Sequence, residues 1–364
     1  MPHPNIRKTA RGRYKPLGFK RSARNLSKFS SKGMIEVQFN WIFVLIVGFI
    51  IFMFIISLVM SQKKNTDNTL KVEILNQLTA SIKGKQQLSS TYSELTIPGN
   101  IQVIFSCDKE VNKFEFLVEG APSREQLPLD VIFVPENMQS SIFIIWTQDF
   151  GLPFIVTRFM YMTTPRSAFF VYSTTPATSA ISKQLYNDLP TNMTKFYITS
   201  QAMLDDRKKG FKKFRVVCFN SDCPAANGND YLNIIPGVSS DVYAYGNLTF
   251  HKSPSTNQGS RYITKAGMLG AVFSDDRDFY ECQMDRAIDQ FNVKRGLQYT
   301  RLKLIQKDLN ESNFECISLL ASPESSLLSM QTLNLSTVNL LYSYSKSIEL
   351  SNQDASFKGC PAVR

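Results

Sequence analysis

Residues 167–199 read SAFFVYSTTPATSAISKQLYNDLPTNMTKFYIT, and they contain a strand, a helix and a second strand in succession. SAFFVYS is an apolar run rich in aromatic residues, which is typical of a buried strand. In the segment that follows, Ile181, Leu185 and Leu189 repeat every four residues and so fall on one face of a helix. KFYIT then supplies the next strand. Nearly continuous apolar strands joined by helical crossovers predict a parallel sheet covered on both faces.

The same rhythm continues on the C-terminal side of this unit. SQAMLDDRKKG at residues 200–210 predicts a second helix, and KFRVVCFN at residues 213–220 predicts a third strand. Upstream, residues 96–148 contain strand-like runs whose connections are too short for helices. These earlier strands either form a separate antiparallel layer or extend the same sheet, and the sequence leaves both open. We therefore expect residues 96–275 to form an α/β domain with a mixed or partly parallel sheet.

The composition becomes helical from residue 276 to residue 364. Five apolar residues fall on one face of a first helix: Ile288, Phe291, Leu302, Ile305 and Leu309. A second helix is predicted to begin with Ser322 as its N-cap and Pro323 at its first position. Together they predict a C-terminal helical hairpin.

Six cysteines follow the apolar run near the N-terminus: Cys107, Cys218, Cys223, Cys282, Cys316 and Cys360. Their number and placement favour disulfides in an oxidising compartment, and the spacing of CFNSDC favours a local bridge between its two cysteines. An unbroken first helix of the hairpin would span roughly 40 Å, and the loop after it would reach back at most ~25 Å. We therefore favour Cys282–Cys360, which leaves Cys107–Cys316 by elimination.

Residues 34–60 are predicted to form a single transmembrane helix. Trp41 to Met60 are twenty consecutive residues without a charge, and at 1.5 Å per residue they match the ~30 Å hydrocarbon core of a bilayer. ISLVMSQKK, which follows, has no small-residue cleavage site of the secretory type. The sequence therefore predicts a signal-anchored, single-pass membrane protein whose first partner is the lipid bilayer.

Charge predicts the orientation of this helix. The chain has a net charge of +11, of which residues 1–33 supply +10 and Glu36 supplies −1, so residues 37–364 carry only +2. The basic segment 1–33 is too polar to bury a core, and we expect it to be disordered and cytoplasmic. The rest of the chain would then be outside the cell membrane. Its near neutrality gives no reason to expect nucleic-acid binding by the ectodomain.

Residues 61–95 are predicted to continue the helix outward as a juxtamembrane stalk. Leu70, Ile74, Leu78 and Ile82 follow one another at intervals of four residues and so form a narrow apolar stripe. Such a stripe packs either on its own ectodomain or on a second copy of the chain, so the stalk could support a homo-oligomer.

Sequons of the form Asn-x-Ser/Thr mark candidate glycosylation sites in the predicted ectodomain. They occur at Asn192, Asn247, Asn310 and Asn334, and a fifth, at Asn25, lies on the inner side. Glycans at the outer four would place these side chains on the surface.

One loop of the parallel unit is a candidate ligand site. In open α/β sheets ligands bind at the carboxyl ends of parallel strands. The loop after the first strand there offers five hydroxyl groups: Ser173, Thr174, Thr175, Thr178 and Ser179. Together with a helix N-terminus they could hold an anion. The same residues are also ordinary helix caps, and the loop has no glycine fingerprint for a pyrophosphate.

No residue set in the sequence marks a reaction, so we expect no catalytic, cofactor-binding or metal-binding residues. His251 is the sole histidine after the apolar run, and every histidine-based mechanism in the ectodomain would depend on it. Whether the chain is an enzyme is left open by the sequence, with the balance against it.

The segment KGMIEVQFNWIFVLIVGFIIF, residues 32–52, resembles the class III signal of archaeal type IV pilins. In that family a peptidase cuts after the glycine of a Lys/Arg-Gly pair, and the apolar helix becomes the core of a filament. The resemblance implies cleavage between Gly33 and Met34. The glutamate that the family often has five places past the cut is here at the third place, as Glu36.

A second resemblance covers most of the chain from Gly33 to Cys282. The blocks QFNWIFVLIVG, WTQDFGLPFIVTRFMYMTTP and LGAVFSDDRDFYEC are similar to those of uncharacterised archaeal single-pass membrane proteins. The resemblance implies an archaeal origin and no known activity. Within the middle block we predict a strand ending at Trp146, a turn at Gly151 and Pro153, and an apolar helix from Phe154 to Met160.

These observations favour a membrane-anchored extracytoplasmic protein that acts by binding or assembly with a surface partner still to be found. The first alternative is a pilin-like subunit cleaved after Gly33. The second is an ectodomain enzyme, which paired carboxylates in a deep pocket at the strand ends would support and a filled sheet end would count against.

Overall fold

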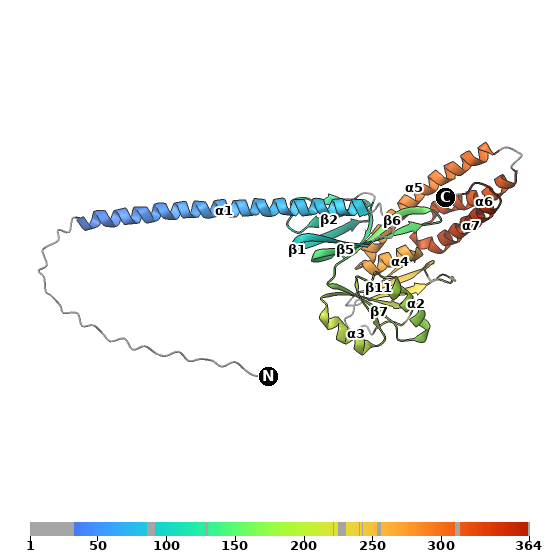
Figure 1. Cartoon of the computed structure of the whole chain (residues 1–364), viewed down its shortest axis with the longest axis horizontal. Helices are drawn as coiled ribbons and strands as arrows, with labels where there is room; N and C mark the ends of the chain where they lie inside the picture. The colour runs from blue at the N-terminus through green and yellow to red at the C-terminus, as the bar shows by residue number, and fades with distance from the viewer. Residues whose placement is uncertain are drawn as a thin grey trace, which may run out of the picture. The chain divides into compact units, whose positions relative to one another are not determined.

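The structure is a computed structural model (Figure 1). It describes residues 33–85, 92–127, 130–220, 222–224, 231–239, 241, 243–252, 256–309 and 314–362. Residues 1–32 of the predicted basic tail (1–33) and the sequons at Asn25 and Asn310 lie outside these ranges. The chain divides into two compact units, Met1–Lys64 and Asn65–Arg364, and each is described by itself.

The first unit contains the apolar part of helix α1, whose bounds are Gly33–Lys85. Side chains from Trp41 to Met60 are almost all exposed, 74% at the first and 68% at the last. Among the described residues this is the one helix long and apolar enough to cross a membrane. The stalk predicted for residues 61–95 is helical to Lys85, whereas residues 92–95 already belong to strand β1.

The second unit contains a six-stranded sheet that follows the end of α1. The sequence left open whether the early strands form a separate layer or extend the parallel sheet. Its strand order is β3-β2-β1-β5-β6-β4, antiparallel except for the parallel pair β4·β6. The strands are β1 (Tyr92–Asp108), β2 (Lys113–Val118), β3 (Glu125–Gln126), β4 (Val131–Phe133), β5 (Asn137–Gly151) and β6 (Ile155–Thr163). The early strands therefore form a separate layer.

The prediction of an apolar helix from Phe154 to Met160 is wrong, because this segment is strand β6. Strand β5 also continues past Trp146 to Gly151 and forms a hairpin with β6. Phe159 packs on one side of this sheet and Met160 on the other, so both faces of β6 are buried. A strand buried on both faces gives a continuous apolar run, which periodicity cannot distinguish from a buried helix.

The end of α1 covers one face of the first sheet (Figure 1). Ile74, Leu78 and Ile82 are at most 1% exposed and pack with Phe105 of β1, whereas Leu70 is 46% exposed. Packing of the stripe on the sheet that follows it in the same chain, one of the two predicted uses, is confirmed. Self-association through the stalk stays a prediction and would have to use other residues.

A second six-stranded sheet confirms the predicted parallel unit. Its order is β12-β11-β10-β9-β7-β8, with β8, β7, β9 and β10 parallel and β11 and β12 antiparallel. The strands are β7 (Ser167–Tyr172), β8 (Thr194–Ile198), β9 (Lys213–Phe219), β10 (Tyr231–Pro236), β11 (Tyr245–Lys252) and β12 (Thr256–Ile263). The crossovers are α2 (Pro176–Asp188) and α3 (Gln201–Arg207), the latter followed by the 3-10 turn η1 (Lys208–Gly210).

Both faces of the parallel strands are covered, as predicted. Leu185 of α2 packs with Phe169 and Val171 of β7 in the main core, whereas Leu204 of α3 packs with Phe170 on the other face. Helices α4 (Thr264–Phe273) and α5 (Arg277–Asp308) complete the main core, which joins the two sheets.

The C-terminal region is helical, as predicted, but it contains three long helices among the described residues. These are α5, α6 (Phe314–Ser329) and α7 (Val338–Phe357), with the short turns η3 (Met330–Thr332) and η4 (Leu335–Thr337) between the last two. Ser322 does not cap a new helix, because Pro323 lies inside α6. Helices α6 and α7 lie side by side and form the hairpin (Figure 1).

The third helix explains why the predicted long-range disulfides are wrong. The bridges are Cys107–Cys282, Cys218–Cys223 and Cys316–Cys360. The local bridge is confirmed. Since α7 runs back along α6, Cys360 ends beside the first turn of α6, where Cys316 lies. Cys282, in the second turn of α5, instead faces the end of β1.

Candidate functional site

The structure brings the predicted hydroxyl loop together around an anion that belongs to the chain itself. The carboxylate of Asp222 accepts the main-chain N–H of Thr174 at 2.8 Å and of Thr175 at 3.0 Å. The hydroxyl of Thr178 donates to it at 2.5 Å, and those of Thr174 and Thr175 donate as well. The buried Ser173 hydroxyl bonds that of Thr178 at 2.8 Å.

Topology explains why these residues meet. Strand β7 leads through α2 to β8 on one side, whereas its other neighbour, β9, leads to β10 on the opposite side. The crevice between the carboxyl ends of β7 and β9 is therefore the switch point at which α/β sheets bind ligands. Asp222 enters this crevice from the loop after β9, which the Cys218–Cys223 bridge closes.

The hydrogen bonds hold Asp222 as a carboxylate. Burial by itself would raise its pKa, but the hydroxyls of Thr174 and Thr178 and the amides of Thr175 and Thr174 lower the pKa to about 2. The anion at this helix N-terminus is thus the Asp222 carboxylate of the chain itself, and binding of a ligand by the predicted loop stays a prediction. The hydroxyl of the fifth residue, Ser179, lies 3.3 Å from the hydroxyl of Tyr197.

Sequence reasoning missed Asp222 because the residue lies 44 positions beyond Thr178. The signal was nevertheless available. Asp222 follows the strand that was predicted to be parallel to β7, and it sits between two cysteines predicted to bridge. Both features place it at the same edge of the sheet as the hydroxyl loop.

A second candidate site, which was not predicted from the sequence, is an open cleft of about 710 Å³. Strands β11 and β12, helix α5, the end of β1 and the turn η4 contribute to its walls. The lining is mostly polar and includes Asn247, Thr249, Ser260, Asn334 and Ser336. Four charged residues also line it: Lys109, Arg261, Glu281 and Asp285.

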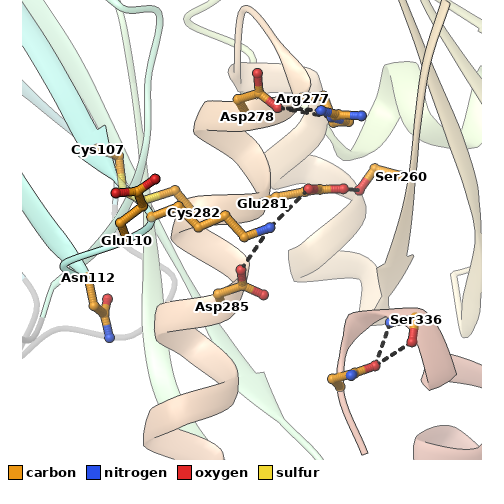
Figure 2. A network of polar contacts seen from close by, with 12 residues as sticks. Cys107, Glu110, Asn112, Ser260, Arg277, Asp278, Glu281, Cys282, Asp285 and Ser336 are labelled. Carbon is orange, nitrogen blue, oxygen red and sulfur yellow. Dashed lines mark hydrogen bonds and ion pairs between the residues drawn. A yellow bond between two sulfur atoms is a disulfide. The ribbon is translucent and has the colours of Figure 1, made fainter.

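An ion-pair network organises one wall of the cleft (Figure 2). Glu281 and Asp285 are one turn apart on α5, and the ammonium group of Lys109 lies 3.2 Å from a carboxylate oxygen of each. The hydroxyl of Ser260 donates to the other oxygen of Glu281 at 3.0 Å. Strand β12 and the end of β1 are thereby joined to the same helix.

The pKa values of this network shift in ways that follow from burial and charge. Burial lowers the pKa of Lys109, but its hydrogen bonds to Asp285 and Glu281 outweigh burial and raise the pKa above its usual value. Burial raises the pKa of Asp285, and the Lys109 ammonium offsets only part of this rise, since the Glu281 and Asp289 carboxylates add to it. Burial and the two neighbouring carboxylates together thus outweigh the Lys109 ammonium, and the pKa of Asp285 lies above its usual value.

The Cys107–Cys282 bridge fixes the two sides of the network (Figure 2). Lys109 comes two residues after one cysteine, and Glu281 comes directly before the other. Further along α5, Asn112 donates to the carboxylate of Asp289 at 2.7 Å. The disulfide and these polar contacts together join the end of β1 and the turn after it to α5.

The sequons have different surroundings. Asn192, Asn247 and Asn334 are all exposed, which suits glycan attachment, although glycosylation itself stays a prediction. Asn247 and Asn334 both lie in the cleft wall, 87 residues apart in the chain. Asn192 lines a smaller cavity of about 290 Å³ together with Tyr92 and Trp146.

His251 is part of a ring stack. Its imidazole lies 4.0 Å from the centroid of the Tyr231 ring. Burial lowers the pKa of His251, and a hydrogen bond with Asn257 opposes this shift. These contacts account for His251 as a packing residue between β10 and β12.

Within the described ranges, no three His, Cys, Asp or Glu side chains lie close enough together to hold a metal ion.

No protein family, curated protein or solved structure matches the chain.

Proposed function

We propose that this chain is a membrane-anchored extracytoplasmic binding protein, and that its cleft takes a carbohydrate-like ligand rich in hydroxyl groups. The observation that carries this proposal is the open, polar cleft over β11, β12 and α5. The more usual position for a ligand, the crevice at the ends of β7 and β9, is filled by Asp222.

The cleft lining supports a hydroxyl-rich ligand in two ways. Its charges balance, since Lys109 and Arg261 oppose Glu281 and Asp285, so it favours neither a strong anion nor a strong cation. It also presents both donors and acceptors, as amides, hydroxyls, carboxylates and cations. A sugar hydroxyl both donates and accepts, and it can use all of these groups.

Location outside the cytoplasm is supported by charge and by cysteine chemistry. The basic segment before the apolar helix favours a cytoplasmic N-terminus. The six cysteines are all bridged in the structure, which suits an oxidising compartment. Labelling intact cells of the source organism with a membrane-impermeant amine reagent checks this orientation. Modified lysines should all follow residue 61, and labelling of the basic segment alone would overturn it.

Binding is tested with the full chain in lipid nanodiscs on a glycan microarray. We expect binding to a defined set of glycans that falls at least about tenfold in Lys109→Met and Asp285→Asn, since each change removes a charge-assisted hydrogen bond. Lys346→Met is the matched control, because Lys346 also pairs with a carboxylate, Glu349 at 2.6 Å, but on α7 away from the cleft lining. Absence of any glycan signal, or equal binding by all variants, would overturn the proposal.

A second candidate is the pilin-like subunit cleaved after Gly33. The observation in its favour is that α1 is one helix from Gly33 to Lys85, whose end is packed on the first sheet by Ile74 and Leu78. An apolar helix that continues into a packed stalk is suited to assembly. Intact mass and N-terminal sequencing of the native protein distinguish the two candidates. A product beginning at Met34 supports assembly, and a product with the basic segment supports an anchor.

Catalysis is not part of this proposal. An enzyme was expected to have paired carboxylates in a pocket at the strand ends. That end of the sheet is filled by Asp222 and its threonine partners, and the carboxylate pair of the cleft, Glu281 and Asp285, is bound to Lys109. This arrangement favours binding over reaction.

A further inference from the structure

A cavity of about 290 Å³ lies between the two sheets, away from the cleft and from the switch point. It opens at the amino ends of β7 and β9 and is closed by the end of α4 and by the loop before β5. A water molecule takes about 30 Å³ in the liquid, so the cavity has room for about ten water-sized groups. That is the size of a small organic molecule.

One wall of the cavity is apolar and one is basic. Phe169 of β7 and Phe273 of α4 belong to the main core and also line the cavity. Lys212, Lys213 and Arg215 supply three cations at the start of β9, whereas the carboxylates in the lining are Glu136 and Asp275. The Asp275 carboxylate accepts the main-chain N–H of Glu136 at 3.2 Å, so it is already engaged.

Arg215 is a fixed cation in this wall. Its side chain is only 9% exposed, and its guanidinium donates to the carbonyls of Ala271 and Asp275 at 3.4 and 3.3 Å. The Cζ atom of this guanidinium lies 5.3 Å from the centroid of the Phe250 ring. The charge therefore stays at the end of α4, and a ligand would not have to order it.

Thr163 has an unsatisfied buried hydroxyl beside the cavity. This residue ends β6, lines the cavity and is 1% exposed. Its hydroxyl is buried and has no hydrogen-bond partner among the described residues. Burying a hydroxyl without a partner costs free energy, and such groups in proteins usually have a partner that completes them.

We propose that this cavity binds a small organic anion, with a carboxylate held by the basic wall and the Thr163 hydroxyl and an aromatic or branched apolar body against Phe169 and Phe273. The apolar wall would not favour inorganic phosphate, and the three cations would not favour a neutral molecule. This site goes beyond the proposed function, because it shares no lining residue with the cleft.

The test uses the full chain in nanodiscs and ¹⁹F NMR, with 4-fluorobenzoate as the anionic probe and 4-fluorotoluene as its neutral counterpart. We expect saturable binding of the anion with a Kd of about 1 mM or tighter, and weaker binding of the neutral probe. Thr163→Val keeps the shape of the side chain and removes the hydroxyl, so it should weaken anion binding about tenfold without unfolding the chain.

Thr147→Val is the matched control, because Thr147 is equally buried in β5 but does not line the cavity. Lys212→Ala, at an exposed position, should weaken binding of the anion and leave binding of the neutral probe unchanged. The proposal is overturned if 4-fluorobenzoate does not bind, if both probes bind equally, or if Thr163→Val and Thr147→Val behave alike.

Discussion

The hydroxyl of Thr178 donates to the carboxylate of Asp222 at 2.5 Å and thereby joins the first turn of α2 to the loop after β9. The pair closes the crevice at which an open α/β sheet would otherwise admit a ligand. In this chain the switch point therefore has a structural role, and the open cleft lies elsewhere.

Replacing Asp222 by Asn should destabilise the second unit. The amide keeps the shape but loses the charge, and one of its two polar atoms then faces donors with a donor of its own. We expect a loss of about 1–3 kcal/mol in the free energy of unfolding, measured by urea denaturation of the full chain. Asp206→Asn, at an exposed position on α3, is the control and should change stability by less than about 0.5 kcal/mol. Equal losses would contradict the assigned role of Asp222.

The same carboxylate should make stability depend on acid pH. Its pKa is lowered to about 2 in the folded chain, compared with an ordinary value of about 3.9 when unfolded. Its contribution is therefore fully present above pH of about 4 and is lost as the pH falls through about 2. Urea midpoints measured across this window should fall more steeply for the wild type than for Asp222→Asn. Parallel curves would show that Asp222 is not stabilised as an anion.

The bridges Cys218–Cys223 and Cys316–Cys360 should differ in how much each contributes to the free energy of unfolding. Cys316–Cys360 joins residues 44 apart and Cys218–Cys223 residues 5 apart. By loop entropy alone, the first contributes about 4 kcal/mol and the second about 2 kcal/mol. Paired serine variants, compared by urea denaturation, should show this order. Peptide mapping without reduction checks the pairing first, and a Cys282–Cys360 peptide would contradict the structure.

The parallel unit was predictable because its signals are local. Ile181, Leu185 and Leu189 mark α2 by their spacing alone, and the flanking strands are short apolar runs. Strand β6 was not predictable, because Phe159 and Met160 are buried on opposite faces and erase the alternation that identifies a strand. The predicted helix start at Pro323 was wrong, because this proline lies inside α6. Without tertiary context, a proline at the start of a helix cannot be distinguished from one inside a helix.

The candidate sites show the same division between local and long-range information. The hydroxyl loop was found from one segment, whereas its partner Asp222 comes from another crossover of the sheet. The cleft was not found, because Lys109 and Glu281 are 172 residues apart and meet only through the packing of α5 on β1. The disulfides failed for a related reason. Their prediction assumed two helices, and the third helix moves Cys360 to the opposite end of the hairpin.

The apolar stripe of the stalk offers a matched pair of positions for a last prediction. Leu78 is fully buried against the first sheet, whereas Leu70, two turns earlier on the same stripe, is 46% exposed. Leu78→Ala should cost about 2–5 kcal/mol in the free energy of unfolding, because it leaves a cavity in a packed interface. Leu70→Ala should cost less than about 1 kcal/mol. Sedimentation of both variants in nanodiscs separates folding from association. If Leu78→Ala dissociated an oligomer while leaving the unfolding curve unchanged, the stripe would bind a second copy of the chain and not its own sheet.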